Sequence, residues 1–274
     1  MPTRAATAAA VASIFDNAKF PGGRPTPENA WVGVYTALLW YEQIAVIPGR
    51  MGLPHLIDAN RLTKAPRKEG KLYVWQQRAI DFERYVAGQF GVSPEKIPSK
   101  VDQLMTLPPY RGLQRHNIIG TAFAALLKHI FETLGNKQVT YELEANGSKA
   151  FPGVELPTRT EVPFIDILVR KGGRNIGIIS TKWSIRHDRI NDLTSECRAY
   201  KSASTWTDTK LFYYVATNEF DPARTVKLIE DKCIREEGGV MHVHKPLVTE
   251  VCKLNGRAQE MLDLSDMIRL TSSW

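Results

Sequence analysis

Cysteine is scarce in this chain of 274 residues, and its pattern suits neither of its usual structural roles. The three cysteines, Cys197, Cys233 and Cys252, are widely spaced, odd in number and without a Cys-x-x-Cys pair. The sequence therefore indicates neither a disulfide framework nor a zinc site. Apolar runs long enough to span a bilayer are also missing, which argues against a membrane partner. The absence of internal repeats and low-complexity tracts excludes solenoid architectures.

Acidic residues are fewer than basic ones, with 29 Asp and Glu against 36 Lys and Arg and a formal charge of +7. An excess of positive charge favours a polyanionic partner such as nucleic acid, although many basic proteins bind none. The N-terminal segment MPTRAATAAAVASIF is rich in alanine and has one arginine. Because it lacks the apolar core of a targeting segment, we expect a first helix there and a cytoplasmic location.

The most informative stretch is residues 162–200, which opens with two short apolar runs joined by the turn Lys171–Asn175. Two glycines between apolar runs predict a β-hairpin. The hairpin would bring Asp166 opposite the region of Ile179 and Ser180, with Lys182 a little further along and within reach. Ser180 and Lys182 share a face because alternate residues of a strand do so. Mg²⁺ prefers oxygen ligands, and a lysine can orient or help to deprotonate an attacking water. The hairpin therefore predicts the site of a metal-dependent nuclease.

The next residues have the chemistry needed to read DNA bases. Arg186, His187, Asp188 and Arg189 place two guanidinium groups and one carboxylate within four positions. A guanidinium can pair with the O6 and N7 edge of guanine, and a carboxylate can accept from cytosine N4. The alternative is a surface turn held by salt bridges, since charges three residues apart pair readily. Glu196 follows on an expected helix and could supply a second carboxylate to the metal.

The stretch resembles the type II restriction endonucleases of the PD-(D/E)XK superfamily that cut CCGG-type and CCNGG-type sites. In that subgroup a serine stands two residues before the lysine, where most of the superfamily has an acid, and the carboxylate lies on the following helix. The resemblance covers residues 162–200. It is carried by Asp166 and by the pattern Ser180-x-Lys182-x-x-x-Arg186-x-Asp188-Arg189 followed by Glu196.

The resemblance implies a role for each matching residue. Asp166 and Glu196 would bind Mg²⁺, and Lys182 would be catalytic. The base-reading residues would be Arg186, Asp188 and Arg189, with Ser180 and His187 in supporting roles. Relatives often carry a glutamate just after a Gly-x-x-Phe element. Here Gly120-Thr-Ala-Phe123 is followed by Ala124, which leaves open whether one or two metals bind.

The function implied is Mg²⁺-dependent hydrolysis of double-stranded DNA at a palindromic site, leaving 5′-phosphates. A palindrome calls for two-fold protein symmetry, so we expect a homodimer, with a tetramer left open. The outer or central base pairs, the cut position and a cognate methyltransferase also stay open. Two alternatives remain. One is a nuclease of the same superfamily without fixed sequence specificity, and the other is a catalytically inactive DNA-binding module.

The expected fold class is α/β, with a restriction-endonuclease-like core, a central mixed β-sheet flanked by helices, and an N-terminal helical region. Residues 1–110 would form the helical region and residues 111–274 the catalytic core, packed as one compact unit. The patterns predict helices over residues 5–20, 31–47, 71–91, 117–134, 191–202, 222–233 and 254–262, and strands over residues 138–145, 162–169, 176–179, 210–217 and 240–248.

Overall fold

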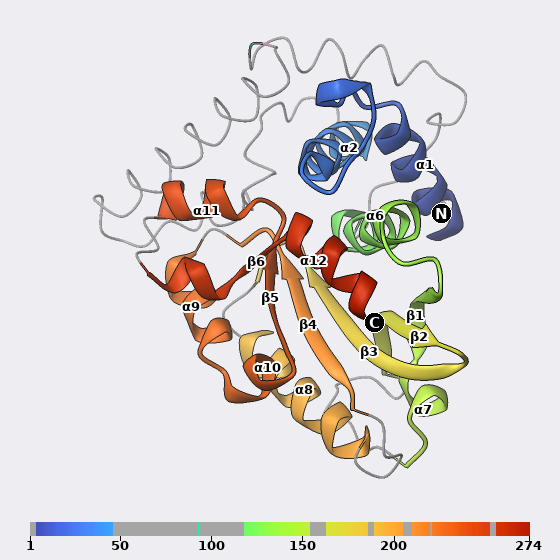
Figure 1. Cartoon of the computed structure of the whole chain (residues 1–274), viewed down its shortest axis with the longest axis vertical. Coiled ribbons are helices and arrows are strands. Elements are labelled where there is room, and N and C mark those ends of the chain that lie inside the picture. The colour runs from blue at the N-terminus through green and yellow to red at the C-terminus, as the bar shows by residue number, and fades with distance from the viewer. Residues whose placement is uncertain are drawn as a thin grey trace. The chain divides into compact units, whose positions relative to one another are not determined.

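A computed structural model describes residues 4–45, 93, 118–153, 163–185, 189–204, 210–219, 221–252 and 256–274 (Figure 1). The chain divides into two compact units, one of residues 1–25 and 29–126 and the other of residues 26–28 and 127–274. The expected boundary near residue 110 and the expected helix over residues 71–91 lie outside the described residues. In the described part of the chain, no helix is long and apolar enough to cross a membrane.

The first unit contains the helices α1 (Arg4–Asp16), η1 (Pro21–Gly23) and α2 (Ala30–Ala45). The aromatic rings of Phe15 and Phe20 meet edge to face, with centroids 5.1 Å apart. Both rings lie against Gly33 of α2, where a Cβ atom would come within 2.4 Å of Phe15 and 2.7 Å of Phe20. Glycine is therefore required at this point for α2 to approach α1 so closely.

The helix expected over residues 117–134 is present as α6 (Ile118–Leu134), and its sequence runs from the first unit into the second. Apolar residues recur along it at the three- and four-residue spacing of a helix face. Those of its buried face include Phe123, Leu126, Leu127, Ile130 and Phe131.

The second unit contains a six-stranded sheet in the order β1-β2-β3-β4-β5-β6 (Figure 1). The first three strands pair antiparallel and the last four pair parallel, so the sheet is mixed. This confirms the α/β class and the mixed central sheet. The strands are β1 (Val139–Asn146), β2 (Phe164–Lys171), β3 (Arg174–Lys182), β4 (Phe212–Thr217), β5 (Gly238–His242) and β6 (Leu262–Asp263).

Both faces of the sheet are covered, as neighbouring residues of β4 show. The Tyr213 hydroxyl donates to Glu196 of the helix α8 (Ile190–Ser204) on one face. Phe212 points to the opposite face and stacks on Trp274, with ring centroids 4.4 Å apart. The remaining helices are α7 (Gly147–Ala150), α9 (Pro222–Ile229), α10 (Lys232–Glu236), α11 (Lys245–Cys252), η7 (Arg257–Glu260), α12 (Leu264–Leu270) and η8 (Thr271–Ser273).

The β2–β3 hairpin forms as the sequence predicts. Lys171 pairs with Arg174, so the turn consists of Gly172 and Gly173, with φ angles of 57° and 78°. Glycine adopts this left-handed backbone without strain, and two such residues suit the right-handed twist of a hairpin. A β-bulge at Val169/Arg170 then shifts the register by one residue, so the turn and the bulge together set the pairing of the functional residues at the other end of the hairpin.

The structure has two helices, α9 and α10, where the sequence predicts one. The prediction of a single helix over residues 222–233 is wrong, because α9 ends at Ile229 and α10 begins at Lys232. The Asp231 side chain accepts from the Ile234 backbone N–H at 3.2 Å, which caps a new helix instead of continuing the old one. Asp221, which directly precedes Pro222 at the start of α9, caps that helix, since its carboxylate accepts from the N–H groups of Ala223 and Arg224.

The C-terminal region also differs from the prediction. The strand expected over residues 240–248 ends at His242, and α11 follows from Lys245, with Pro246 in its first turn, where proline is tolerated. The prediction of a helix over residues 254–262 is wrong as well. The described part of that range holds only the short η7 and the first residue of β6, and α12 begins at Leu264. Asp263 and Asp266 cap α12 reciprocally in a capping box.

Candidate active site

Asp166 is the centre of a polar cluster at the open end of the β2–β3 hairpin. Its Oδ2 atom accepts from Lys182 Nζ at 2.6 Å, from the Thr181 backbone N–H at 2.7 Å and from Ser180 Oγ at 3.2 Å. The side chains of Asp166 and Lys182 are 30% and 33% exposed, so the ion pair is open to solvent on one side. Three of the residues singled out from the sequence therefore meet at one carboxylate oxygen.

The sheet explains why these side chains meet. Leu168 pairs with Ile178, so the same register places Asp166 beside Ser180, two residues further along each strand. Ser180 and Lys182 lie on the same face of β3 because they are two residues apart. Tyr213 of β4 lies on that face as well, since it pairs in register with Ile178. This is the face that α8 covers.

Glu196 of α8 approaches the cluster from above this face. Its Oε2 atom accepts from the Tyr213 hydroxyl at 3.3 Å. The pKa of Glu196 is raised, chiefly by burial. The Lys182 ammonium acts to lower this pKa, and the Asp166 carboxylate acts to raise it. Because Tyr213 lies on the same sheet face as Ser180 and Lys182, its bond to Glu196 places that carboxylate over the face that carries the Asp166–Lys182 pair.

Two tyrosines that the sequence analysis did not single out belong to the same site. Burial raises the pKa of Tyr213, and the neighbouring carboxylates of Glu196 and Asp166 raise it further. Burial and the same two carboxylates also raise the pKa of Tyr200, which packs against Phe151 with ring centroids 5.2 Å apart. The four-residue spacing of Glu196 and Tyr200 was the available signal, because it puts both on one face of α8. No local signal identified Tyr213.

The four-residue base-reading segment is described only at Arg189. Arg186, His187 and Asp188 lie outside the described residues. Arg189 Nη1 donates to Asp192 Oδ2 at 2.9 Å, three residues on, and its side chain is 46% exposed. This is the pairing that the surface-turn alternative expects. Contact of Arg189 with a base would require this exposed ion pair to open.

The carboxylates of Asp166 and Glu196 suit Mg²⁺, which prefers oxygen ligands and commonly binds through one or two carboxylates together with substrate phosphate and water. Among the described residues, no group of three or more His, Cys, Asp or Glu side chains could hold a metal ion. Two carboxylates are a ligand set that Mg²⁺ commonly takes from a protein, and this set is smaller than that of a closed structural metal site. Ala124 is buried and has no side-chain ligand to offer.

His242 and His244 are two residues apart on and just after β5, a spacing that could suggest a metal pair. The His242 Nδ1 atom accepts from the His244 backbone N–H at 3.1 Å, so it closes a turn at the end of the strand. His244 Nδ1 lies 3.9 Å from Asp263 Oδ2. Burial lowers the pKa of both rings. These contacts favour a structural role.

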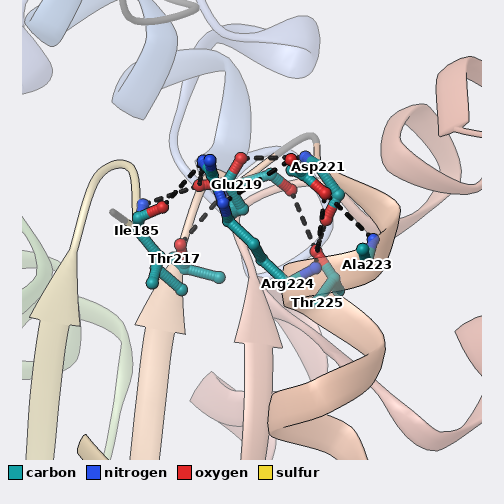
Figure 2. Close-up of polar contacts among 7 residues, drawn as sticks. All are labelled: Ile185, Thr217, Glu219, Asp221, Ala223, Arg224 and Thr225. Carbon is teal, nitrogen blue, oxygen red and sulfur yellow. Dashed lines mark hydrogen bonds and ion pairs between the residues drawn. The ribbon is translucent and has the colours of Figure 1, made fainter. Parts of the chain in front are cut away.

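A second polar cluster, also missed by the sequence analysis, joins the ends of β3 and β4 (Figure 2). Glu219, just after β4, accepts from the backbone N–H groups of Ile185 and Asp221 at 2.6 Å and 2.8 Å. Arg224 of α9 donates to the Ile185 carbonyl oxygen at 2.9 Å. The only sequence signal was an acid and an arginine close to a predicted helix start, which is common at protein surfaces.

Comparison of the chain with protein-family models, with curated proteins and with solved structures found no match.

Proposed function

We propose that this protein is a type II restriction endonuclease, which hydrolyses double-stranded DNA at a palindromic site containing CCGG or CCNGG and leaves 5′-phosphates. The observation that carries the proposal is that Asp166, Lys182 and Glu196 gather at one face of the sheet, where Lys182 bonds to Asp166 and Tyr213 bonds to Glu196. They come from a strand, its hairpin partner and the next helix, and Ser180 stands at the position that the resemblance requires. A structural ion pair alone would not need a second, half-buried carboxylate on the same face.

The finer fold assignment belongs to the same proposal. The restriction-endonuclease-like core would consist of the β2–β3 hairpin, the parallel strands that follow and α8. The mixed sheet with helices on both faces supports this assignment. Two copies of the chain would bind one palindrome, because each copy would read one half of the site.

In the proposed reaction Asp166 and Glu196 would hold Mg²⁺, which when bound stabilises negative charge on the phosphate and lowers the pKa of a bound water. The Lys182 ammonium lies 2.6 Å from Asp166 and is partly open to solvent. From there its positive charge would orient the attacking water and stabilise the hydroxide formed as this water gives a proton to solvent, and the departing O3′ atom would take a proton from solvent. In-line attack on phosphorus breaks the bond to O3′, which leaves a 3′-hydroxyl and a 5′-phosphate. Tyr213 would hold the Glu196 carboxylate in place through its hydroxyl.

Base reading would come from Arg186, Asp188 and Arg189, with His187 in a supporting role. Each good bidentate contact with a base contributes about 1–3 kcal/mol of discrimination. Arg189 is the member of this set whose surroundings are described. Its exposed pair with Asp192 costs little to open, because surface ion pairs contribute about 0–1 kcal/mol. The excess of basic residues over acidic ones supports a polyanionic substrate.

Cleavage of short duplexes tests the proposal. Duplexes containing CCGG, CCNGG or a scrambled site are incubated with Mg²⁺ and the wild-type protein, Arg189→Ala or the control Arg198→Ala. Arg198 lies on α8 and, like Arg189, is exposed and paired with a carboxylate, that of Asp231. We expect cutting at one motif only, loss of cutting in Arg189→Ala and no change in Arg198→Ala. Equal cutting of every duplex favours the non-specific nuclease. Binding of DNA without hydrolysis favours the inactive module.

A further inference from the structure

The chain leaving β3 is held by the connection between β4 and α9 (Figure 2). The Asn218 backbone N–H donates to the Trp183 carbonyl oxygen at 3.1 Å. Two residues later both backbone groups of Ile185 bind side chains. Its N–H donates to Glu219 Oε2 at 2.6 Å, and its carbonyl oxygen accepts from Arg224 Nη1 at 2.9 Å. The position of Ile185 is therefore fixed through both of the peptide groups that flank its Cα atom.

The two side chains that hold Ile185 are themselves fixed. Glu219 is 2% exposed, and its second oxygen accepts from the Asp221 backbone N–H at 2.8 Å. Arg224 Nη1 lies 3.7 Å from Glu219 Oε2, and its Nε lies 3.5 Å from Asp221 Oδ2. Hydrogen bonds with an ionised partner are shorter and stronger than neutral ones. A buried carboxylate with this many donors gives a rigid attachment point.

The location of this attachment is what makes it functional. Ile185 follows Lys182 by three residues and directly precedes Arg186, the first residue of the proposed base-reading segment. A restriction endonuclease must cut only when the correct bases are read, so its cutting and reading groups need a fixed relative position. A misplacement of about 1 Å away from the chemistry can cost roughly 100-fold in rate.

We propose that Glu219 and Arg224 are positioning residues for sequence discrimination. They would fix the point at which the chain passes from the catalytic Lys182 to the Arg186–Arg189 segment. This inference rests on the proposed function. It differs from a purely structural role in one measurable respect. Weakening the pair should lower the preference for the cognate site in protein that remains folded, whereas a structural pair would affect stability alone.

Two conservative variants test the inference. Glu219→Gln keeps the shape of the side chain, but replaces one acceptor oxygen by a donor. Arg224→Lys keeps the charge and loses the planar donors that reach Ile185. Matched controls come from surface ion pairs of the same unit. Glu237→Gln alters the pair with Lys210, 3.2 Å apart, and Arg198→Lys alters the pair with Asp231, 2.7 Å apart.

The measurement is kcat/KM for a duplex with the cognate site, divided by kcat/KM for duplexes in which one recognised base pair is changed. Urea unfolding of each variant is recorded in parallel. We expect this ratio to fall by about 10- to 100-fold in Glu219→Gln and Arg224→Lys and to stay unchanged in both controls. Should Glu219→Gln not fold, Arg224→Lys decides, because its side chain is less buried, at 18% exposed.

A ratio within twofold of wild type in the folded variants would overturn the inference and leave the proposed function intact. Loss of folding in both variants would assign the pair to stability and would also overturn it. A wild-type protein that does not distinguish the duplexes would remove the base-reading part of the proposed function, and this inference with it. The three failures are therefore distinguishable.

Discussion

Replacement of Asp166 by asparagine separates the proposed catalytic role of this residue from a structural one. Asparagine has nearly the same shape, but it carries no charge and has one acceptor oxygen where the carboxylate has two. In the structure Oδ2 of Asp166 accepts from an ammonium, a backbone N–H and a hydroxyl. The amide oxygen of asparagine can take the place of Oδ2 for these donors. We therefore expect the substitution to leave the fold intact and to remove the negative charge that the proposed Mg²⁺ site needs.

The expected loss of stability is small. A hydrogen bond to a charged group contributes about 1 kcal/mol more than a neutral one. The Lys182–Asp166 pair is about one-third exposed, so solvent screens much of its attraction. Together these effects predict that Asp166→Asn lowers the free energy of unfolding by about 1–2 kcal/mol. Lys182 would also lose its anionic partner, but it can turn to solvent.

The expected loss of cleavage is much larger. We expect the rate of Mg²⁺-dependent cleavage to fall by at least about 1000-fold, which corresponds to about 4 kcal/mol of lost transition-state stabilisation. Single-turnover cleavage of a supercoiled plasmid gives the rate, and urea unfolding gives the stability. The control is Glu142→Gln, because Glu142 pairs with Arg170 on the same three-stranded antiparallel part of the sheet and is more exposed.

Two results would refute this reasoning. Cleavage by Asp166→Asn within tenfold of wild type would show that the carboxylate does not hold the metal. A loss of stability so large that the variant is unfolded in the assay would show that Asp166 is needed for folding, and the cleavage rate would then carry no information on catalysis.

Three further predictions follow from the same site and its surroundings. Lys182→Ala should bind cognate DNA in gel-shift assays with Ca²⁺ but not cleave it with Mg²⁺; retained cleavage would remove Lys182 from the catalytic set. Tyr213→Phe loses the bond to Glu196 at 3.3 Å. It should raise the Mg²⁺ concentration for half-maximal cleavage about tenfold, and an unchanged Mg²⁺ titration would contradict the positioning role. Burial lowers the pKa of His242 from 6.5 to about 3, so the folded state favours the neutral ring. Below about pH 6.5 the unfolded state binds the extra proton, and stability should fall by about 2 kcal/mol between pH 7 and pH 5. In His242→Asn the urea midpoint should lose this part of its dependence on pH. A midpoint that changes with pH as much as in the wild type would show that His242 is not the group responsible.

The features that sequence predicts well here are set by neighbouring residues. The Gly172-Gly173 turn predicts the β2–β3 hairpin that brings Asp166 near Ser180, and a β-bulge at Val169/Arg170 completes the final register. The cap at Asp221 and the apolar face of α6 are equally local, because each depends on residues within a few positions of one another.

The features that sequence does not predict depend on contacts between distant segments. The contact of Tyr213 with Glu196 joins β4 to α8. Glu219 accepts a hydrogen bond from the backbone N–H of Ile185, 34 residues away in the sequence. The strand after Val240 is cut short because the Lys245 N–H donates to Asp263, 18 residues further on. An apolar pattern alone cannot distinguish the strand from the helix that replaces it.

Digestion of a sequenced plasmid tests the central claim most directly. The plasmid is incubated with the wild-type protein and Mg²⁺, with Ca²⁺ as the control, and the ends of all products are sequenced. The account predicts discrete fragments in Mg²⁺ only, all ending at one motif that contains CCGG or CCNGG and bearing 5′-phosphates. A smear of random ends would contradict base reading by the Arg186–Arg189 segment. Intact plasmid in Mg²⁺ would contradict the endonuclease itself.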